Sequence, residues 1–251
     1  MNLLRPEVRL LFWKEIRQLT RNQGAMLTGL FLPAALVVLA PVLALLASRS
    51  PSLRAVPIRE VPASLLGLFG LAGIQDWFLF VTLPLLFTLA GVLTPTLIAA
   101  HTVVSERERH SLELLVALPV SLGDILAAKM VANLVTGLAI IVPMFLVDAV
   151  LVLTLTPVGM PYVLGAVSLL VSALLAAMGG GLLQALMARD ARTSNYVSAA
   201  LAVPPLFVAA LCVVFVPGSA RFYVEALLML ALGAGAFNAA GRWLTLERYL
   251  T

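Results

Sequence analysis

Residues 77–103 read WFLFVTLPLLFTLAGVLTPTLIAAHTV and contain no Asp, Glu, Lys or Arg. An apolar stretch of about 18 or more residues can cross the hydrocarbon core of a bilayer as a helix. The backbone must be helical there, because lipid offers no partners for unpaired amide groups. Five other stretches are comparably apolar. The sequence therefore predicts an all-α integral membrane protein with six transmembrane helices, at 25–47, 77–103, 131–154, 162–188, 196–216 and 222–241.

The composition of the whole chain agrees with this class. Of its 251 residues 62% are hydrophobic and only 11% are charged, whereas about a quarter of the residues of a soluble domain are charged. The net charge of +4 does not indicate nucleic-acid binding, because the basic residues lie in short segments between apolar stretches. The first apolar stretch is also too long for a signal-peptide core of about 7–15 residues, so we expect no cleaved leader.

Lysine and arginine positions predict the orientation. With the N-terminus inside, four basic residues face outward: Arg49, Arg54, Arg59 and Arg221. The cytoplasmic segments then hold Arg5, Arg9, Lys14, Arg17, Arg21, Arg107, Arg109, Lys129, Arg189, Arg192, Arg242 and Arg248. Because cytoplasmic segments are enriched in Lys and Arg, we expect a multi-pass protein of the cell membrane with both termini in the cytoplasm.

The N-terminal segment, 1–24, predicts a helix of a different kind. Its apolar residues recur at helical spacing on one face, and its arginines lie away from that face. Such a helix lies in the membrane interface, with Trp13 at the depth of the headgroups; the alternative is a solvated basic leader. The apolar face consists of Val8, Leu11, Phe12, Ile16 and Leu19, and the interfacial residues of interest are Trp13, Lys14, Glu15 and Arg17.

The sequence offers little for catalysis or metal binding. It has two histidines, His101 and His110, in no metal-binding spacing, and a single cysteine. A phosphate-binding P-loop needs a lysine after a glycine, but the only lysines are Lys14, after Trp13, and Lys129, after Ala128. We therefore expect no metal, no cofactor and no catalytic residue in this chain.

The segment between the second and third spans has features of its own. Residues 105–119 read SERERHSLELLVALP. Ser105 and Glu108 have the spacing of a capping box, and Ser111 is placed to cap a short helix that Pro119 ends. Taken by themselves, these residues fit either a short docking helix or an ordinary solvated loop.

This segment resembles the inner loop of permease subunits of type-2 ABC exporters. In that family an acidic and basic stretch leads to a Gly-Thr-Leu-Glu-Leu-Leu run, a proline, a serine and a Gly-Lys pair. The amphipathic Lys14-Glu15-Ile16-Arg17 segment and the six spans extend the resemblance over most of the chain. The sequence departs from the family at His110, Ser111 and Ala128, and matches it at Glu106, Glu108, Arg109, Leu112, Glu113, Leu114, Leu115, Pro119, Ser121 and Lys129.

The resemblance implies a single transmembrane permease domain over 1–251. Residues 105–129 would be the coupling segment, between 25–104 with spans 1–2 and 130–241 with spans 3–6, and 242–251 would be a cytoplasmic tail. The implied partners are ABC ATPase subunits, which bind ATP and Mg, and a second permease copy or a homologous permease. The implied coupling residues are Glu106, Glu108, Arg109, Leu112, Glu113, Leu115 and Pro119. The rival interpretation is a channel-like or membrane-assembly protein that works without an ATPase.

Polar residues inside the spans are candidates for the transport pathway. An ionised Asp148 within the third span is costly unless it faces the bundle interior, although a position near the interface remains an alternative. Gln184 and Asn195 either contribute to the pathway or form hydrogen bonds between helices. The run Gly179, Gly180 and Gly181 allows close helix approach or a flexible point. The largely apolar bundle favours a hydrophobic or amphiphilic substrate.

Overall fold

The computed structural model describes residues 6–21, 23–49, 74–108, 122–187 and 191–243. In these ranges the chain is helical apart from short turns, and no strand occurs. The elements are α1 (Pro6–Arg21), α2 (Gln23–Pro33), η1 (Ala34–Leu39), α3 (Ala40–Arg49), α6 (Ile74–Trp77), η2 (Phe78–Thr82), α7 (Leu83–Glu108), α9 (Leu122–Leu155), α10 (Met160–Met187), α11 (Ala191–Phe215) and α12 (Ala220–Trp243).

Six helices in the described ranges are long and apolar enough to cross a membrane, which confirms the six predicted spans. The first span consists of α2, η1 and α3, and the second of η2 and α7. The predicted break between the third and fourth spans lies at residues 156–159, between α9 and α10. The third membrane-spanning helix, α9, begins at Leu122 and not at residue 131. Its first turns therefore precede the apolar span, which begins at Ala128.

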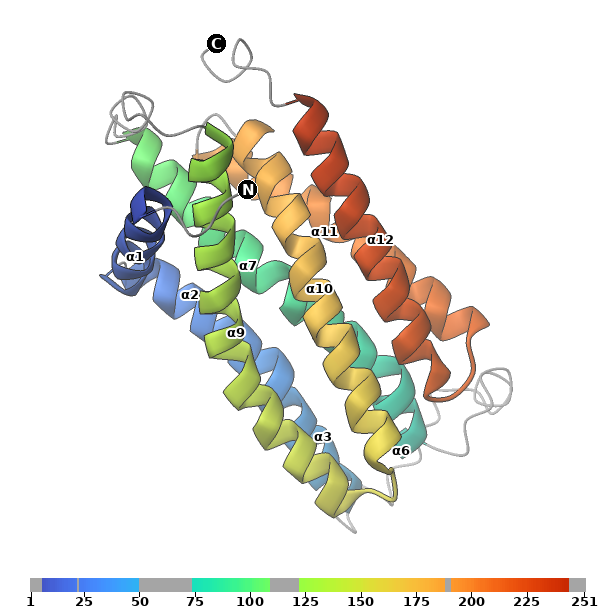
Figure 1. Cartoon of the computed structure of the whole chain (residues 1–251). Coiled ribbons are helices and arrows are strands. Elements are labelled where there is room, and N and C mark those ends of the chain that lie inside the picture. The colour runs from blue at the N-terminus through green and yellow to red at the C-terminus, as the bar shows by residue number, and fades with distance from the viewer. Residues whose placement is uncertain (1–5, 22, 50–73, 109–121, 188–190, 244–251) are drawn as a thin grey trace.

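The six spans form one bundle, with α1 at one end (Figure 1). That end, called the α1 end below, also carries the last turn of α7, the start of α9 and the end of α12. The opposite end carries the turn from α9 to α10 and the start of α12. Helix α10 is central: it packs most extensively against α12 and α7, and also against α9 and α11.

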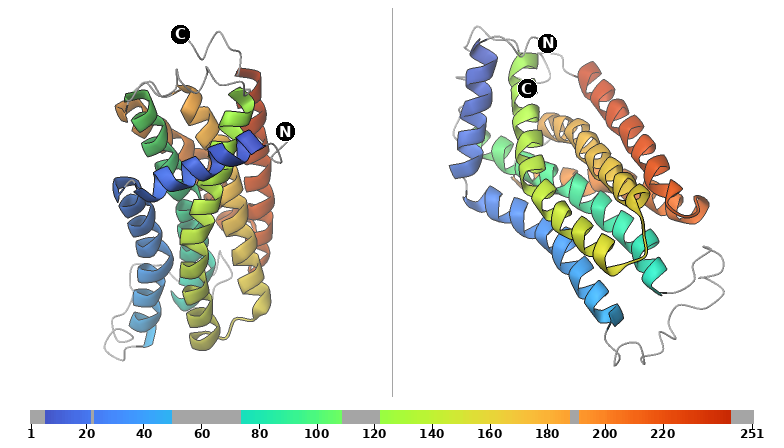
Figure 2. Two further views of the ribbon diagram at one scale, coloured as in Figure 1. Left: turned by 60° about the vertical axis from the view of Figure 1, so that its left-hand side comes forward. Right: turned by 60° about the horizontal axis from the view of Figure 1, so that its bottom comes forward.

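Helix α1 crosses the bundle instead of continuing along it (Figure 2). It packs on α9 and has one buried stripe, made of Leu11, Glu15 and Leu19, at the spacing of successive turns. Leu10 and Trp13 are exposed. The predicted amphipathic helix is therefore present, but its buried face has a carboxylate in the middle.

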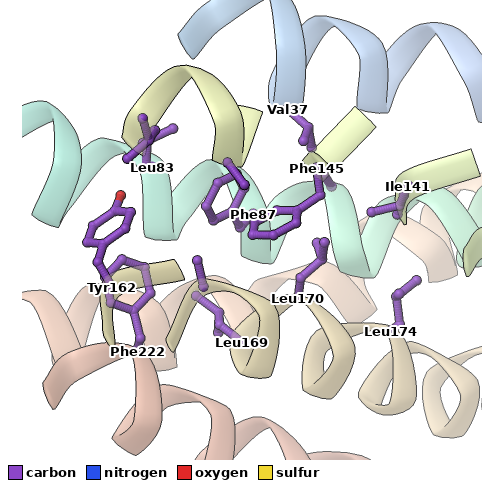
Figure 3. Close-up of a cluster of buried hydrophobic side chains, with 14 of the residues drawn as sticks. Val37, Leu83, Phe87, Ile141, Phe145, Tyr162, Leu169, Leu170, Leu174 and Phe222 are labelled. Carbon is purple, nitrogen blue, oxygen red and sulfur yellow. The ribbon is translucent and has the colours of Figure 1, made fainter. Parts of the chain in front are cut away.

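The core lies between the first span, α7, α9, α10 and α12, and Val37 of η1 is part of it (Figure 3). The ring of Phe87 meets that of Phe145 edge-on, with ring centroids 5.6 Å apart. Glycines let the helices approach closely at other levels. A methyl group added at Gly179 on α10 would lie 2.5 Å from the carbonyl oxygen of Gly233 on α12, so only a residue without a side chain fits there.

Candidate functional site

An ion pair joins α1 to the start of the third span. The Nζ atom of Lys129 on α9 lies 3.3 Å from Oε1 of Glu15 on α1. Both side chains are largely buried, 11% and 4% exposed. An isolated buried carboxylate is very costly, so the ammonium of Lys129 is what allows Glu15 to lie between Leu11 and Leu19. The structure thus joins two residues that the sequence placed in separate segments.

The other predicted residues of this end divide into two groups. Trp13 and Arg17 are exposed on α1, and Lys14 is half-exposed with its Nζ 3.6 Å from Glu15. Glu106 and Glu108 lie in the last turn of α7, where the structure describes only their backbone. The remaining coupling residues, Arg109, Leu112, Glu113, Leu115 and Pro119, lie outside the described residues, as does the predicted coupling helix.

Near the opposite end, five side chains form what we call the buried polar cluster: Thr88, Asp148, Tyr162, Arg221 and Glu225. Each is at most 4% exposed. They come from α7, α9, α10 and α12, so the cluster connects four helices.

The backbone of η2 explains two contacts of this cluster. The amide of Leu83 donates to the carbonyl of Phe78 in a wide π-helical turn, and Pro84 has no amide hydrogen. The carbonyls of Leu79 and Phe80 therefore lose their usual helical donors. The Tyr162 hydroxyl donates to the carbonyl of Leu79 at 2.9 Å, and the Arg221 guanidinium donates to that of Phe80. Local sequence thus creates two acceptors that distant side chains satisfy.

Arg221 and Glu225 lie one turn apart on α12 and interact electrostatically. The Nε atom of Arg221 also donates to the carbonyl of Val216, at 3.1 Å. The hydroxyl of Thr88 on α7 donates to Oε1 of Glu225, at 2.5 Å. Oε2 of Glu225 has no hydrogen-bond partner among the described residues. These contacts tie the start of α12 to α7 and η2.

Asp148 lies inside the bundle, not at its surface, and its side chain is 1% exposed. Its Oδ1 atom has no hydrogen-bond partner among the described residues. The carboxyl lies near the phenol of Tyr162. Whether Asp148 contributes to a transport pathway stays a prediction.

The other two pathway candidates lie nearer the α1 end. The Nε2 atom of Gln184 on α10 donates to the Ser198 hydroxyl on α11, at 2.6 Å, and both side chains are buried. Gln184 therefore forms a hydrogen bond between helices, which was one of the two roles predicted for it. Asn195 lies in the first turns of α11, where its side chain is not described.

The roles of Arg221 and Glu225 were not predicted from the sequence. Arg221 was expected among the cations of the outer segments, and its side chain is 1% exposed. A signal was available, because Glu225 lies inside the sixth span and an ionisable residue there calls for a partner. Arg221, four residues earlier on the same helix face, is the natural one. No sequence signal pointed to Thr88.

No group of three or more His, Cys, Asp or Glu side chains that could hold a metal ion occurs in the described part of the chain. The described residues instead show buried hydrogen bonds between helices and the ion pair of Glu15 with Lys129.

The fold and these buried polar contacts define a multi-pass α-helical membrane protein. Residues 9–228 match a family described as "ABC-2 family transporter protein". The match covers most of the chain, and the chain belongs to this family as a membrane component of a transporter. The resemblance to type-2 ABC permeases is thereby confirmed. Comparisons with curated proteins and with solved structures gave no match.

Proposed function

We propose that this chain is the membrane-spanning permease subunit of an ATP-driven exporter, coupled to separate cytoplasmic ATPase subunits. The family membership supports the permease role. The observation that supports coupling is the pair of Glu15 and Lys129. It joins α1 to the first turns of α9, the helix in which the last residues of the predicted coupling segment, 122–129, lie. A force applied to that segment or to α1 would therefore reach the same point of the bundle.

The proposed cycle uses the two ends of the bundle differently. ATP-driven closure of the ATPases displaces the α1 end through the coupling segment, including Glu113. The buried polar cluster holds α7, α10 and α12 together at the other end. Access to the opposite side of the membrane requires these contacts to rearrange. Asp148, Gln184 and Asn195 are the proposed pathway residues, and the apolar bundle fits a hydrophobic or amphiphilic substrate. A second permease, identical or homologous, would complete the pathway.

The proposal is tested by affinity purification of the full chain from nanodiscs, with identification of the subunits that copurify. An ABC ATPase in equal amounts is expected. Its absence, with the permease folded and abundant, would favour a channel-like or membrane-assembly protein that works without an ATPase.

Glu113→Arg tests the coupling segment itself. If Glu113 meets a basic groove on the ATPase, the substitution replaces attraction by repulsion, which costs several kcal/mol at an interface. Membrane abundance should stay normal, while ATPase association or substrate-stimulated ATP hydrolysis is lost. Wild-type abundance, ATPase association and ATP hydrolysis would together show that Glu113 has no part in coupling and that this segment is an ordinary solvated loop.

A further inference from the structure

A cavity of about 360 Å³ lies between α7, α10, α11 and α12. Its floor is buried and includes Thr96 of α7 with Ala177 and Gly180 of α10. Pro204 of α11 and Gly235 and Ala239 of α12 also line it, and these three residues are exposed. The cavity therefore opens sideways, between α11 and α12, within the membrane-spanning part of both helices.

The cavity is suited to hydrocarbon. Among the described residues that line it, Thr96 alone has a polar side chain. Its hydroxyl donates to the carbonyls of Val92 and Leu93 in its own helix, at 2.9 and 3.0 Å. Apolar cavities of about 150 Å³ stay free of water and bind benzene. A cavity more than twice that size, opening at membrane depth, has room for part of an acyl chain.

A basic residue lies beside the opening. Arg242 follows Gly235 by seven residues and Ala239 by three, so all three share one face of α12. At a rise of about 1.5 Å per residue, Arg242 lies about 10 Å from Gly235 along the axis, toward the α1 end. Arg242 is exposed and ends the apolar part of the sixth span. Because Arg242 ends an apolar span, we expect its guanidinium at the depth of lipid headgroups, where cations attract anionic phosphates.

We propose that this cavity is a binding site for an anionic membrane phospholipid. One acyl chain enters between α11 and α12 and fills the cavity, and the headgroup phosphate pairs with Arg242. The lipid is a resident component of the bundle and does not need the ATPase to bind.

The glycines of α12 provide a matched pair of variants. A methyl group added at Gly235, which lines the cavity, or at Gly241, which does not, would meet nothing within 4 Å. Gly235→Phe should fill the opening, while Gly241→Phe adds the same side chain to the same helix outside the cavity. Gly180→Val obstructs the cavity from α10, where the nearest side-chain atom to an added methyl is 3.8 Å away on Leu201.

The test uses the purified full chain in nanodiscs of phosphatidylcholine with a trace of photoreactive phosphatidylglycerol, which carries a diazirine in mid-chain. After illumination, labelled peptides are identified by mass spectrometry. The informative labels are those on Thr96 and Ala177, which are 1% and 4% exposed and so out of reach of lipid around the bundle. The same measurement with photoreactive phosphatidylcholine reports the preference for the anionic headgroup.

We expect labelling of the floor in the wild type and in Gly241→Phe, and its loss in Gly235→Phe and Gly180→Val. Arg242→Gln should remove the preference for phosphatidylglycerol. Gel filtration and circular dichroism establish that each variant is folded, and either cavity variant suffices if the other fails. Equal labelling in the wild type and a folded cavity variant would overturn the proposal. So would an unlabelled floor in the wild type, including the case in which a second permease copy covers the opening. Neither result bears on ATPase association.

Discussion

At the residue scale, this membrane protein buries several ionisable side chains, and four of them have partners at the two ends of the bundle. Glu15 and Lys129 pair at the α1 end. Arg221 and Glu225 lie together near the opposite end, where Arg221 bonds the carbonyl of Phe80 and Glu225 accepts from Thr88. Because breaking a buried pair leaves an uncompensated charge, these residues should be more sensitive to substitution than the exposed charges of α1.

The first prediction concerns the pair of Glu15 and Lys129. Glu15→Ala should lower the free energy of unfolding by about 1.5–3 kcal/mol, because it removes a hydrogen bond between charged and largely buried groups. Lys129→Ala should have a comparable effect, and the double variant should cost less than the sum. Thermal unfolding in detergent measures the stability. Lys14→Ala is the control, since its half-exposed pair with Glu15 should contribute less than about 1 kcal/mol. Strictly additive effects would show that the two residues do not interact.

The second prediction concerns the hydrogen bond from Thr88 to Glu225. Thr88→Val keeps the shape of the side chain but removes the donor, and should destabilise the bundle by about 1–2 kcal/mol, near the upper end for bonds between transmembrane helices. Thr154→Val is a matched control, because the exposed Thr154 hydroxyl bonds only within its own helix, to the carbonyls of Val150 and Leu151. Equal stability of the two variants, by chemical unfolding in mixed micelles, would contradict the importance of this bond.

At the element scale, prolines and glycines decide how the spans meet. Pro84 and the π-helical turn of η2 free carbonyls that Tyr162 and Arg221 bind. Two neighbouring glycines of α10 have different surroundings. Gly179 is packed against the backbone of α12, whereas Gly180 faces the cavity. Of the two roles predicted for these glycines, close helix approach is therefore observed at Gly179.

The third prediction follows from these adjacent glycines. Gly179→Ala should destabilise the protein by about 1–3 kcal/mol, because the new methyl group would collide with the backbone of Gly233 and push α10 from α12. Gly180→Ala should be tolerated, since its methyl group would meet Leu201 at an ordinary 3.8 Å. The two variants have the same composition change, so helix propensity cancels. The melting temperatures in one detergent make the comparison, and a Gly179→Ala variant as stable as Gly180→Ala would refute the close contact.

At the scale of the whole molecule, the described helices place α1 and the end of α12 at the same end of the bundle (Figure 1). The even number of spans requires this arrangement, while the distribution of Lys and Arg predicts that this end faces the cytoplasm.

The fourth prediction tests that orientation in whole cells. The native Cys212, which is buried, is first removed by the substitution Cys212→Ser. A cysteine at Glu108, in the last turn of α7, should be protected from a membrane-impermeant maleimide until the cells are opened. A cysteine at Gly159, exposed in the turn between α9 and α10, should react from outside. The opposite labelling pattern would show that the predicted orientation is wrong and that the α1 end faces outward.

The sequence by itself determined the number of spans, their approximate limits and the amphipathic helix that precedes them. These features depend on apolar length and helical periodicity, which are local properties of the chain. Only the tertiary structure decided that Glu15 pairs with Lys129, that Thr88 bonds Glu225 and that Arg221 lies inside the bundle. Partners in the first two contacts are 114 and 137 residues apart along the chain. Which of many polar groups meet depends on how the helices rotate and cross, and that is set by the packing of the bundle as a whole.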